Sequence, residues 1–165
     1  MTDELCESEN QTLDKKQVNR AIAYGSRLLA AREYSAKNMA EKMRSKKYQP
    51  DEIEAAIDML KENNWLSDQR FCESFLRSKV NQGLGKQRIV YELTSKGISQ
   101  SMIQNSMNEL EVDWLEMCLQ TASRKVASSG LTNDLKDKQK LYRFLQYRGF
   151  SGEHIRTALK QHFND

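Results

Sequence analysis

The sequence predicts an all-α protein built from three tandem three-helix repeats that form an elongated, curved molecule. Pairs of apolar residues recur at helical spacing with a period of about 50 residues. Only one proline and seven glycines interrupt the 165 residues, and no stretch alternates polar and apolar residues over the length of a strand. With 38% hydrophobic and 30% charged residues, a row of small cores fits the composition better than one deep core.

The repeat is clearest in pairs of apolar residues four positions apart, which lie on one face of a helix. Equivalent pairs are shifted by 50 residues from the first unit to the second and by 52 from the second to the third. The pairs of the second helix in each unit are Met39/Met43, Ile89/Leu93 and Leu141/Leu145, and those of the third helix are Ile53/Ile57, Ile103/Met107 and Ile155/Leu159.

A turn of similar design separates the two pairs in every unit, at residues 47–50, 97–99 and 149–151. Glycine suits the position after a helix, where φ is positive, and Gln49-Pro50 or a serine starts the next helix. The apolar residue of each turn is expected to fill the joint between the helices. These residues are Tyr48, Ile98 and Phe150.

A longer helical pattern precedes each pair and supplies the first helix of the unit. In the third unit this helix begins at Asp113, with Glu116 three residues later, which is the spacing of a capping box.

The resulting organisation is an acidic N-terminal tail (1–14) followed by three-helix repeats at 15–66, 67–111 and 112–165. Each repeat is too small to bury much surface alone, so neighbouring repeats should share contacts.

Charge follows the same period. Residues 15–48 contain ten Lys or Arg against two acids, residues 69–100 contain six against two, and residues 117–148 contain seven against two. Residues 49–68 and 101–116 are acidic instead. One interpretation is a set of solvated helix faces, and the other is a ladder of basic patches that faces a polyanion or an acidic protein surface.

Several classes of protein are not expected. No apolar run is long enough to span a bilayer, and the N-terminus lacks the basic and apolar parts of a signal peptide, so we expect a cytoplasmic protein. Cys6, Cys72 and Cys118 are widely spaced and read as free thiols, and no Cys–His cluster accompanies His154 and His162. The sequence predicts no metal site.

An enzyme is not expected either. The Gly83-Leu84-Gly85 segment lacks the third glycine and the preceding strand of a dinucleotide fingerprint, and it reads as a turn between helices. No GxSxG, Walker or HExxH sequence occurs. We therefore predict a protein without catalytic residues and without a cofactor.

The residues around the joint between the first two units form a specific pattern. Asn64-Trp65-Leu66-Ser67-Asp68-Gln69-Arg70-Phe71 is followed by Gly83-Leu84-Gly85-Lys86, Ile89, Glu92-Leu93 and Lys96-Gly97-Ile98, and later by Phe144-Leu145-Gln146-Tyr147-Arg148-Gly149-Phe150. In order, spacing and repeat count these motifs resemble the RecX family over residues 17–163. Asn64 stands where that family often has glycine, and asparagine tolerates the left-handed conformation.

The resemblance implies a regulator of the RecA recombinase that acts in DNA repair by homologous recombination and in the SOS response. Members of the family bind the RecA nucleoprotein filament along its groove and mainly inhibit its strand exchange, ATP hydrolysis and co-protease activity. The expected partner is therefore the RecA filament, with single- or double-stranded DNA as an auxiliary contact and no membrane. We expect a monomer.

The alternative is a direct DNA-binding helical-repeat protein that acts without RecA. Three-helix units resemble helix-turn-helix architecture, and Lys136, Lys140 and Arg143 fall on one helix face with Tyr142 and Tyr147 available for stacking. A net charge of only +3 argues against tight DNA binding. A scaffold protein is a third interpretation, and a steep loss of affinity with salt would distinguish phosphate binding from the other two.

The predicted partner-binding residues are basic side chains of the second and third units. They are Arg70, Arg77, Lys86, Arg88, Lys96, Arg124, Lys125, Lys140, Arg143 and Arg148. Each has a structural alternative; for example, Arg70 could pair with a nearby acid and Arg148 could cap the C-terminus of a helix. Trp65, Phe71 and Phe75 are predicted to be core residues rather than contact residues.

Overall fold

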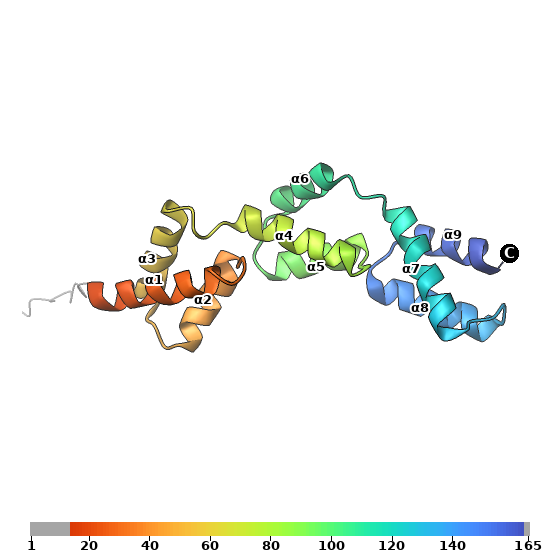
Figure 1. The fold of residues 1–165 in the computed structure, drawn as a ribbon, viewed down its shortest axis with the longest axis horizontal. Helices are drawn as coiled ribbons and strands as arrows, with labels where there is room; N and C mark the ends of the chain where they lie inside the picture. Colours follow the sequence, from red (N-terminus) through yellow and green to blue (C-terminus); the bar gives the residue numbers. More distant parts are fainter. Residues whose placement is uncertain (1–13, 164–165) are drawn as a thin grey trace, which may run out of the picture. The chain divides into compact units, whose positions relative to one another are not determined.

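The computed structural model describes residues 14–163 and contains nine α-helices and no strand in that range (Figure 1). The helices are α1 (Lys15–Leu29), α2 (Ala36–Ser45), α3 (Pro50–Glu62), α4 (Asp68–Asn81), α5 (Lys86–Ser95), α6 (Gln100–Leu110), α7 (Trp114–Ser129), α8 (Leu135–Arg148) and α9 (Gly152–Phe163). The chain divides into two compact units between Leu66 and Ser67. The predicted all-α class with tandem three-helix repeats is confirmed. Apart from Asp14, the predicted acidic tail lies outside the described residues.

Short polar side chains begin most of the helices. Asp14, Ser35, Ser67, Ser99 and Asp113 each accept a hydrogen bond from a backbone N–H two or three residues later. These bonds satisfy N–H groups that have no partner within the helix. The predicted cap at Asp113 is confirmed, with its Oδ1 2.9 Å from the backbone N three residues on.

The turn after the second helix has the same backbone geometry in all three repeats. Lys47, Gly97 and Gly149 have φ angles of 66°, 83° and 92°. In each turn the N–H of the next residue donates to the carbonyl five residues before it, at 3.4, 3.2 and 3.2 Å, as in a Schellman motif. Lys47 therefore adopts a conformation that glycine adopts in the other two repeats.

Burial follows the predicted repeat of apolar residues. The six residues of the second-helix pairs all have 0% of their surface exposed, and they are Met39, Met43, Ile89, Leu93, Leu141 and Leu145. In the first unit α1 packs mainly against α3. A Cβ added at Gly25 of α1 would lie 2.7 Å from Cδ1 of Leu60, so the absence of a side chain there allows the two helices to approach closely.

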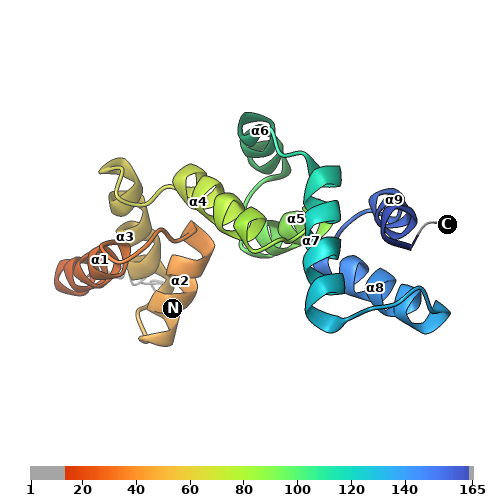
Figure 2. The same cartoon turned by 45° about the vertical axis from the view of Figure 1, so that its right-hand side comes forward.

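The second compact unit, which begins at Ser67 and comprises the second and third repeats, contains two cores, one for each repeat. Phe71, Leu76, Leu93 and Ile103 belong to the core of α4–α6, and Leu145 belongs to that of α7–α9. Trp114, the first residue of α7, packs against the core of α4–α6. Figure 2 shows this unit from a second direction. The predicted sharing of contacts between neighbouring repeats is therefore present within this unit.

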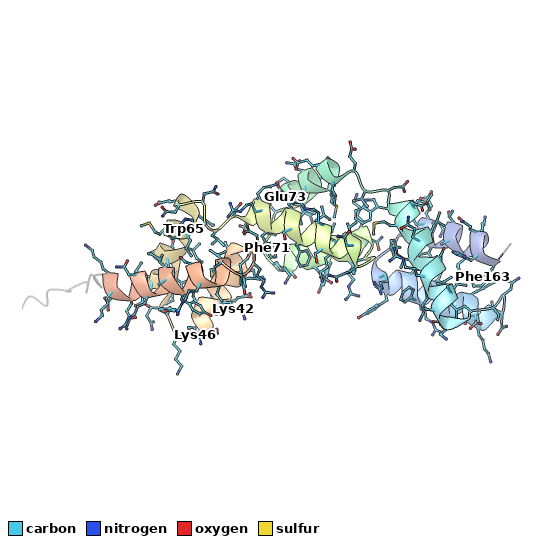
Figure 3. The ribbon with its side chains drawn as sticks, viewed as in Figure 1. Lys42, Lys46, Trp65, Phe71, Glu73 and Phe163 are labelled. Carbon is cyan, nitrogen blue, oxygen red and sulfur yellow. The ribbon has the colours of Figure 1, made fainter. Side chains whose placement is uncertain are left out.

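The prediction that Trp65 is a core residue is wrong. Its side chain is labelled in Figure 3 and is 52% exposed, whereas Leu66 is 2% exposed. Asn64 has a φ of 56°, and the N–H groups of the two residues after it both donate to the Leu60 carbonyl, at 2.9 and 3.0 Å. This tight turn allows Leu66 to enter the core in place of the tryptophan.

The other two aromatic residues in that prediction lie closer to the core. Phe71 is 8% exposed and belongs to it, while Phe75 is partly buried and packs against it. The Lys79 and Lys96 ammonium groups lie 5.1 and 5.6 Å from the Phe75 ring centroid.

Within residues 14–163, no helix has the length and apolar character that a membrane span requires.

Candidate functional site

The second and third repeats meet where the end of α8 touches the start of α5. The backbone N–H of Gly85 donates to the Arg148 carbonyl at 2.8 Å, and that of Gln87 donates to the Gly149 carbonyl at 3.1 Å. Helix N-termini have spare donors and helix C-termini have spare acceptors, so each helix end satisfies the other. The opposite ends of the two helix dipoles also attract. We call this contact the α5–α8 joint.

Both glycines of the α5–α8 joint are required by close packing. A Cβ at Gly85 would lie 2.3 Å from the carbonyl carbon and oxygen of Gly149, and one at Gly149 would lie 2.4 Å from Cβ of Arg88. Real Cβ atoms do not approach other atoms so closely. The Gly83-Leu84-Gly85 segment is therefore part of a contact between helix ends, in agreement with its interpretation as a turn.

Two of the predicted partner-binding residues hold the α5–α8 joint together. Arg88 donates through Nη1 to the Tyr147 carbonyl at 3.1 Å, and its guanidinium carbon lies 4.6 Å from the centroid of the Tyr147 ring. Arg148 donates through Nη1 to the Gln82 carbonyl at 2.6 Å, at the C-terminal cap of α4. The structural alternative for Arg148, a cap on a helix C-terminus, is the one observed.

Arg88 is also fixed from the other side by Glu92. Its Nε donates to Glu92 Oε1 at 3.0 Å, and Lys79 Nζ lies 3.4 Å from Oε2 of the same carboxylate. Burial acts to raise the pKa of Glu92, but the Arg88 hydrogen bond and the Lys79 charge outweigh it and lower the pKa below its usual value. The hydrogen bond to Glu92 correspondingly raises the pKa of Arg88.

Three of the predicted bases come together in a pocket of about 360 Å³ beside the α5–α8 joint. Arg124 and Lys125 come from α7, and Arg148 comes from the end of α8. The remaining lining residues are Gln82, Gly83, Thr121, Ser128 and Phe144, so no carboxylate lines this space. We call it the basic pocket.

Phe144 positions two of the three cations of the basic pocket. Lys125 Nζ lies 5.2 Å and Arg148 Cζ 5.1 Å from the centroid of its ring, within the range of cation–π attraction. Within residues 14–163, none of the three bases has a carboxylate at ion-pair distance. Their positive charges are therefore not neutralised by the described chain.

Thr121 is the buried polar side chain of the basic pocket. The residue is 6% exposed, and its hydroxyl can donate one hydrogen bond and accept others. Gly83 also lines the pocket and lies beside this hydroxyl, because a Cβ added there would be 3.1 Å from Thr121 Oγ1.

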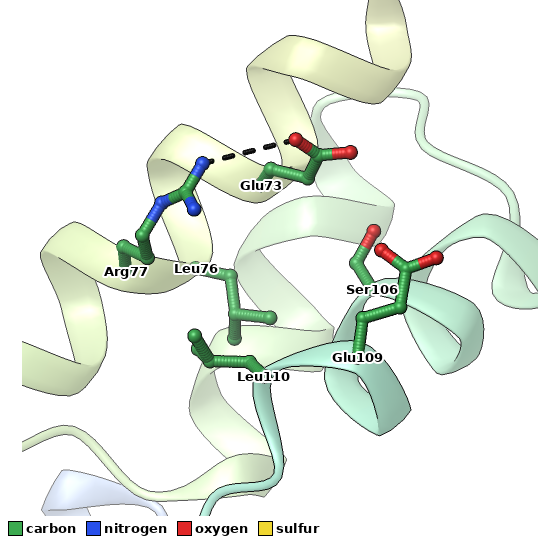
Figure 4. A pocket seen from close by; sticks show the side chains of 6 residues that line it. All are labelled: Glu73, Leu76, Arg77, Ser106, Glu109 and Leu110. Carbon is green, nitrogen blue, oxygen red and sulfur yellow. Dashed lines mark ion pairs between the residues drawn. The ribbon is translucent and has the colours of Figure 1, made fainter.

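The other predicted bases lie outside the basic pocket. Arg77 is exposed and forms an ion pair of 3.7 Å with Glu73, beside a pocket of about 90 Å³ that Ser106 and Glu109 also line (Figure 4). Two carboxylates border that small pocket, so it is unsuited to an anion. Arg70 and Lys96 are half-buried, whereas Lys86, Lys140 and Arg143 are exposed.

Sequence reasoning did not identify Thr121 or Phe144, because neither residue type signals binding outside its spatial context. It also placed no site residue in the first unit, where Arg20, Lys46 and Lys47 line a pocket of about 310 Å³. The signal for that surface was available, since residues 15–48 carry the largest excess of Lys and Arg of any segment. Lys46 is labelled at the end of α2 in Figure 3.

The described cysteines have no features of a reactive site. Cys72 and Cys118 are both fully buried. Burial raises the pKa of Cys118 to about 11 and also raises the pKa of Cys72, so neither is a thiolate at neutral pH. Within residues 14–163, no group of three His, Cys, Asp or Glu side chains is placed to hold a metal ion.

Comparison with known proteins confirms the family resemblance over most of the chain. The families of the first, second and third three-helix domains of RecX match residues 21–60, 67–107 and 111–159. "Regulatory protein RecX" of Actinobacillus pleuropneumoniae serotype 5b is 37% identical over 145 residues, covering 88% of this chain and 94% of the relative. The protein of the same name from Haemophilus ducreyi is 38% identical over 135 residues, covering 82% and 87%.

A solved structure agrees with the fold. The crystal structure of RecX from Lactobacillus salivarius superposes with a TM-score of 0.73 at 21% sequence identity, and covers 90% of this chain and 97% of that one. At this level of identity the likeness concerns the fold alone.

Proposed function

Because this chain belongs to the RecX family, we propose that it regulates the RecA recombinase, mainly as an inhibitor, by binding the RecA nucleoprotein filament. The observation that carries the proposal is the match of all three repeats to the three RecX domains, in order. Binding in the filament groove would reduce strand exchange, ATP hydrolysis and co-protease activity. In this proposal the protein acts in the cytoplasm, in recombinational repair and the SOS response, without catalysis of its own.

Fewer of the predicted basic residues are available to contact a filament than their number in the sequence suggests. Arg88 and Arg148 support the α5–α8 joint, so their replacement would change the fold as well as the surface. Arg77, Lys86, Arg124, Lys140 and Arg143 are exposed. A single exposed charge contributes little, but several contacts held on one body add up to high avidity. Groups of substitutions are therefore the proper test.

The experiment measures RecA-dependent ATP hydrolysis on single-stranded DNA at increasing concentrations of this protein. One variant carries Lys140→Glu, Arg143→Glu and Arg124→Glu, and its control carries Arg156→Glu and Lys160→Glu on exposed positions of α9. We expect the first variant to need at least about tenfold more protein for half inhibition, equivalent to about 1.4 kcal/mol. The control should inhibit like the wild type.

The outcomes separate two claims. A wild-type protein that leaves RecA activity unchanged at every concentration would refute the proposed function itself. A charge-reversed variant that folds and inhibits like the wild type would refute only the assignment of these bases to the contact. Helix content and thermal melting of both variants establish that the fold is retained.

A direct DNA-binding protein that acts without RecA is the second candidate. The observation that favours it is the exposed row formed by Lys136, Lys140 and Arg143 on α8. If this is the main activity, affinity for DNA alone should be high and should fall steeply with salt. The protein should then have no effect on RecA at concentrations that leave most of the DNA uncovered.

A further inference from the structure

We propose that the basic pocket beside the α5–α8 joint binds one backbone phosphate of a nucleic-acid strand through Arg124, Lys125 and Thr121. The inference deepens the proposed function, on which it rests only for the presence of a nucleic acid at the filament. Three cations and no carboxylate line the pocket, and none of the cations is in an ion pair within residues 14–163. An anion is therefore the ligand class that fits the pocket.

The pocket provides hydrogen-bond donors in addition to charge. Arg148 uses one nitrogen for the Gln82 carbonyl, so most of the five N–H donors of its guanidinium stay available. Thr121 is 6% exposed and lines the pocket, and its hydroxyl supplies one more donor. A ligand oxygen in the pocket can accept a hydrogen bond from this hydroxyl. Three cations without a carboxylate in the lining distinguish this pocket from an ordinary mixed-charge surface.

The number and origin of the donors favour a phosphate over a carboxylate. A carboxylate presents two oxygens in one plane, and a single guanidinium fork satisfies both. Here donors come from two residues of α7 that are three positions apart, from the neighbouring Lys125 and from the end of α8. A tetrahedral phosphate group can accept from such separate directions. Arginine, lysine, serine and threonine are also the side chains that most often contact the backbone of nucleic acids.

The same residues argue against a protein ligand. Lysine is depleted from the buried centres of protein–protein interfaces, whereas it is common at phosphate contacts. The aromatic ring of Phe144 lies against Lys125 and Arg148 and positions them. A pocket of this type holds a strand by its backbone and does not read its sequence.

The test measures binding of a fluorescently labelled oligothymidine strand to the full-length protein without RecA, by fluorescence anisotropy at several salt concentrations. The pocket variant carries Arg124→Gln and Lys125→Gln. Its matched control carries Arg156→Gln and Lys160→Gln, which removes the same charge from α9. Thr121→Val removes the hydroxyl while keeping the size and shape of the side chain.

We expect the pocket variant to bind at least about tenfold more weakly than the control. Loss of one phosphate contact should also reduce the slope of log K against log salt by about 0.7, the value for single strands. Thr121→Val should weaken binding severalfold with the slope unchanged, because it removes a hydrogen bond and no charge. Retained melting temperatures show that the effects are local.

Three results would overturn the inference. The first is absence of strand binding by the wild type, and the second is an equal loss of binding in the pocket and control variants. The third is pocket-dependent binding of a labelled poly-glutamate peptide that exceeds binding of the strand, which would assign the pocket to an acidic protein segment. RecA-dependent ATP hydrolysis is measured in parallel. Its inhibition by the wild type without strand binding would refute the pocket inference while the proposed function stands, and the reverse result would refute the proposed function alone.

Discussion

Adding one methyl group at Gly85 is expected to break the α5–α8 joint. The residue has φ −78° and ψ 162°, which any amino acid adopts, so alanine is not strained there by its backbone conformation. Its Cβ would instead lie 2.3 Å from the carbonyl carbon and oxygen of Gly149 and 2.5 Å from the N of Phe150. All three are backbone atoms and cannot rotate away. The two helix ends must therefore separate.

The expected loss of stability follows from the steric overlap and from the hydrogen bonds that are weakened when the two helix ends separate. Overpacking typically costs about 1–3 kcal/mol. Stretching the two backbone hydrogen bonds of the joint adds about 0.5–1.5 kcal/mol for each. Gly85→Ala should therefore reduce the free energy of unfolding by about 2–6 kcal/mol. The change is a large fraction of the typical total stability of a small domain, which is about 5–15 kcal/mol.

Substitutions at three other glycines distinguish the cost of steric overlap from the cost of a left-handed backbone conformation. Gly130 has a φ of 58° with nothing within 4 Å of an added Cβ, so Gly130→Ala should cost only the left-handed conformation, about 1–2 kcal/mol. Gly152→Ala meets its nearest atom at 3.4 Å, the far end of the Arg156 side chain, and should change stability little. Gly149→Ala combines a φ of 92° with overlap of the Arg88 backbone and should be the most damaging.

Urea denaturation followed by circular dichroism at 222 nm measures all four variants under the same conditions. The expected order of destabilisation is Gly149→Ala, then Gly85→Ala, then Gly130→Ala, with Gly152→Ala nearest to the wild type. If Gly85→Ala were as stable as Gly152→Ala, the close approach of α5 and α8 would be wrong.

Three more predictions concern the middle and third repeats. Leu93→Ala should reduce stability by about 2–5 kcal/mol in urea denaturation because Leu93 is fully buried, whereas Tyr91→Ala, at a side chain 75% exposed, should cost far less. Folding lowers the pKa of Glu92, so the ionised carboxylate stabilises the fold above its unfolded pKa of about 4.5, and this stabilisation is lost as the pH falls through the lower pKa of the folded state. In a pH series of melting curves, Glu92→Gln should therefore lose less stability at acid pH than the wild type. Iodoacetamide at pH 8 should leave Cys72 and Cys118 unlabelled in the native protein and should label both in urea, as mass spectrometry would detect, because burial keeps both thiols protonated.

The fold was predictable because its determinants are local and repeated. The shift of 50 and then 52 residues aligns positions such as Met43, Leu93 and Leu145, and all three are fully buried. The turn was predictable for the same reason, since glycine marks it in two repeats. The exposure of Trp65 was not predicted, because it depends on the left-handed conformation of Asn64, which allows Leu66 to reach the core.

The site was predictable in its charge but not in its arrangement. Arg88 and Arg148 bind carbonyls that lie 59 and 66 residues away in the sequence, so no local pattern reveals that the joint uses them. Thr121 of α7 lines the basic pocket together with Gln82 and Gly83 from the end of α4, which lie far from it in the sequence. No local sequence pattern indicates that this threonine lies beside the three bases.

The α5–α8 joint also connects stability with the proposed binding. Arg148 donates to the Gln82 carbonyl, and both residues line the basic pocket. The carbonyl of Arg148 is the acceptor for Gly85, so a substitution that separates α5 from α8 moves a wall of the pocket without touching the proposed ligand. Gly85→Ala should therefore weaken strand binding under conditions where it stays folded, whereas Gly130→Ala, whose added Cβ meets nothing within 4 Å, should not. If the two variants bind equally well at equal folded fractions, the pocket does not depend on the joint.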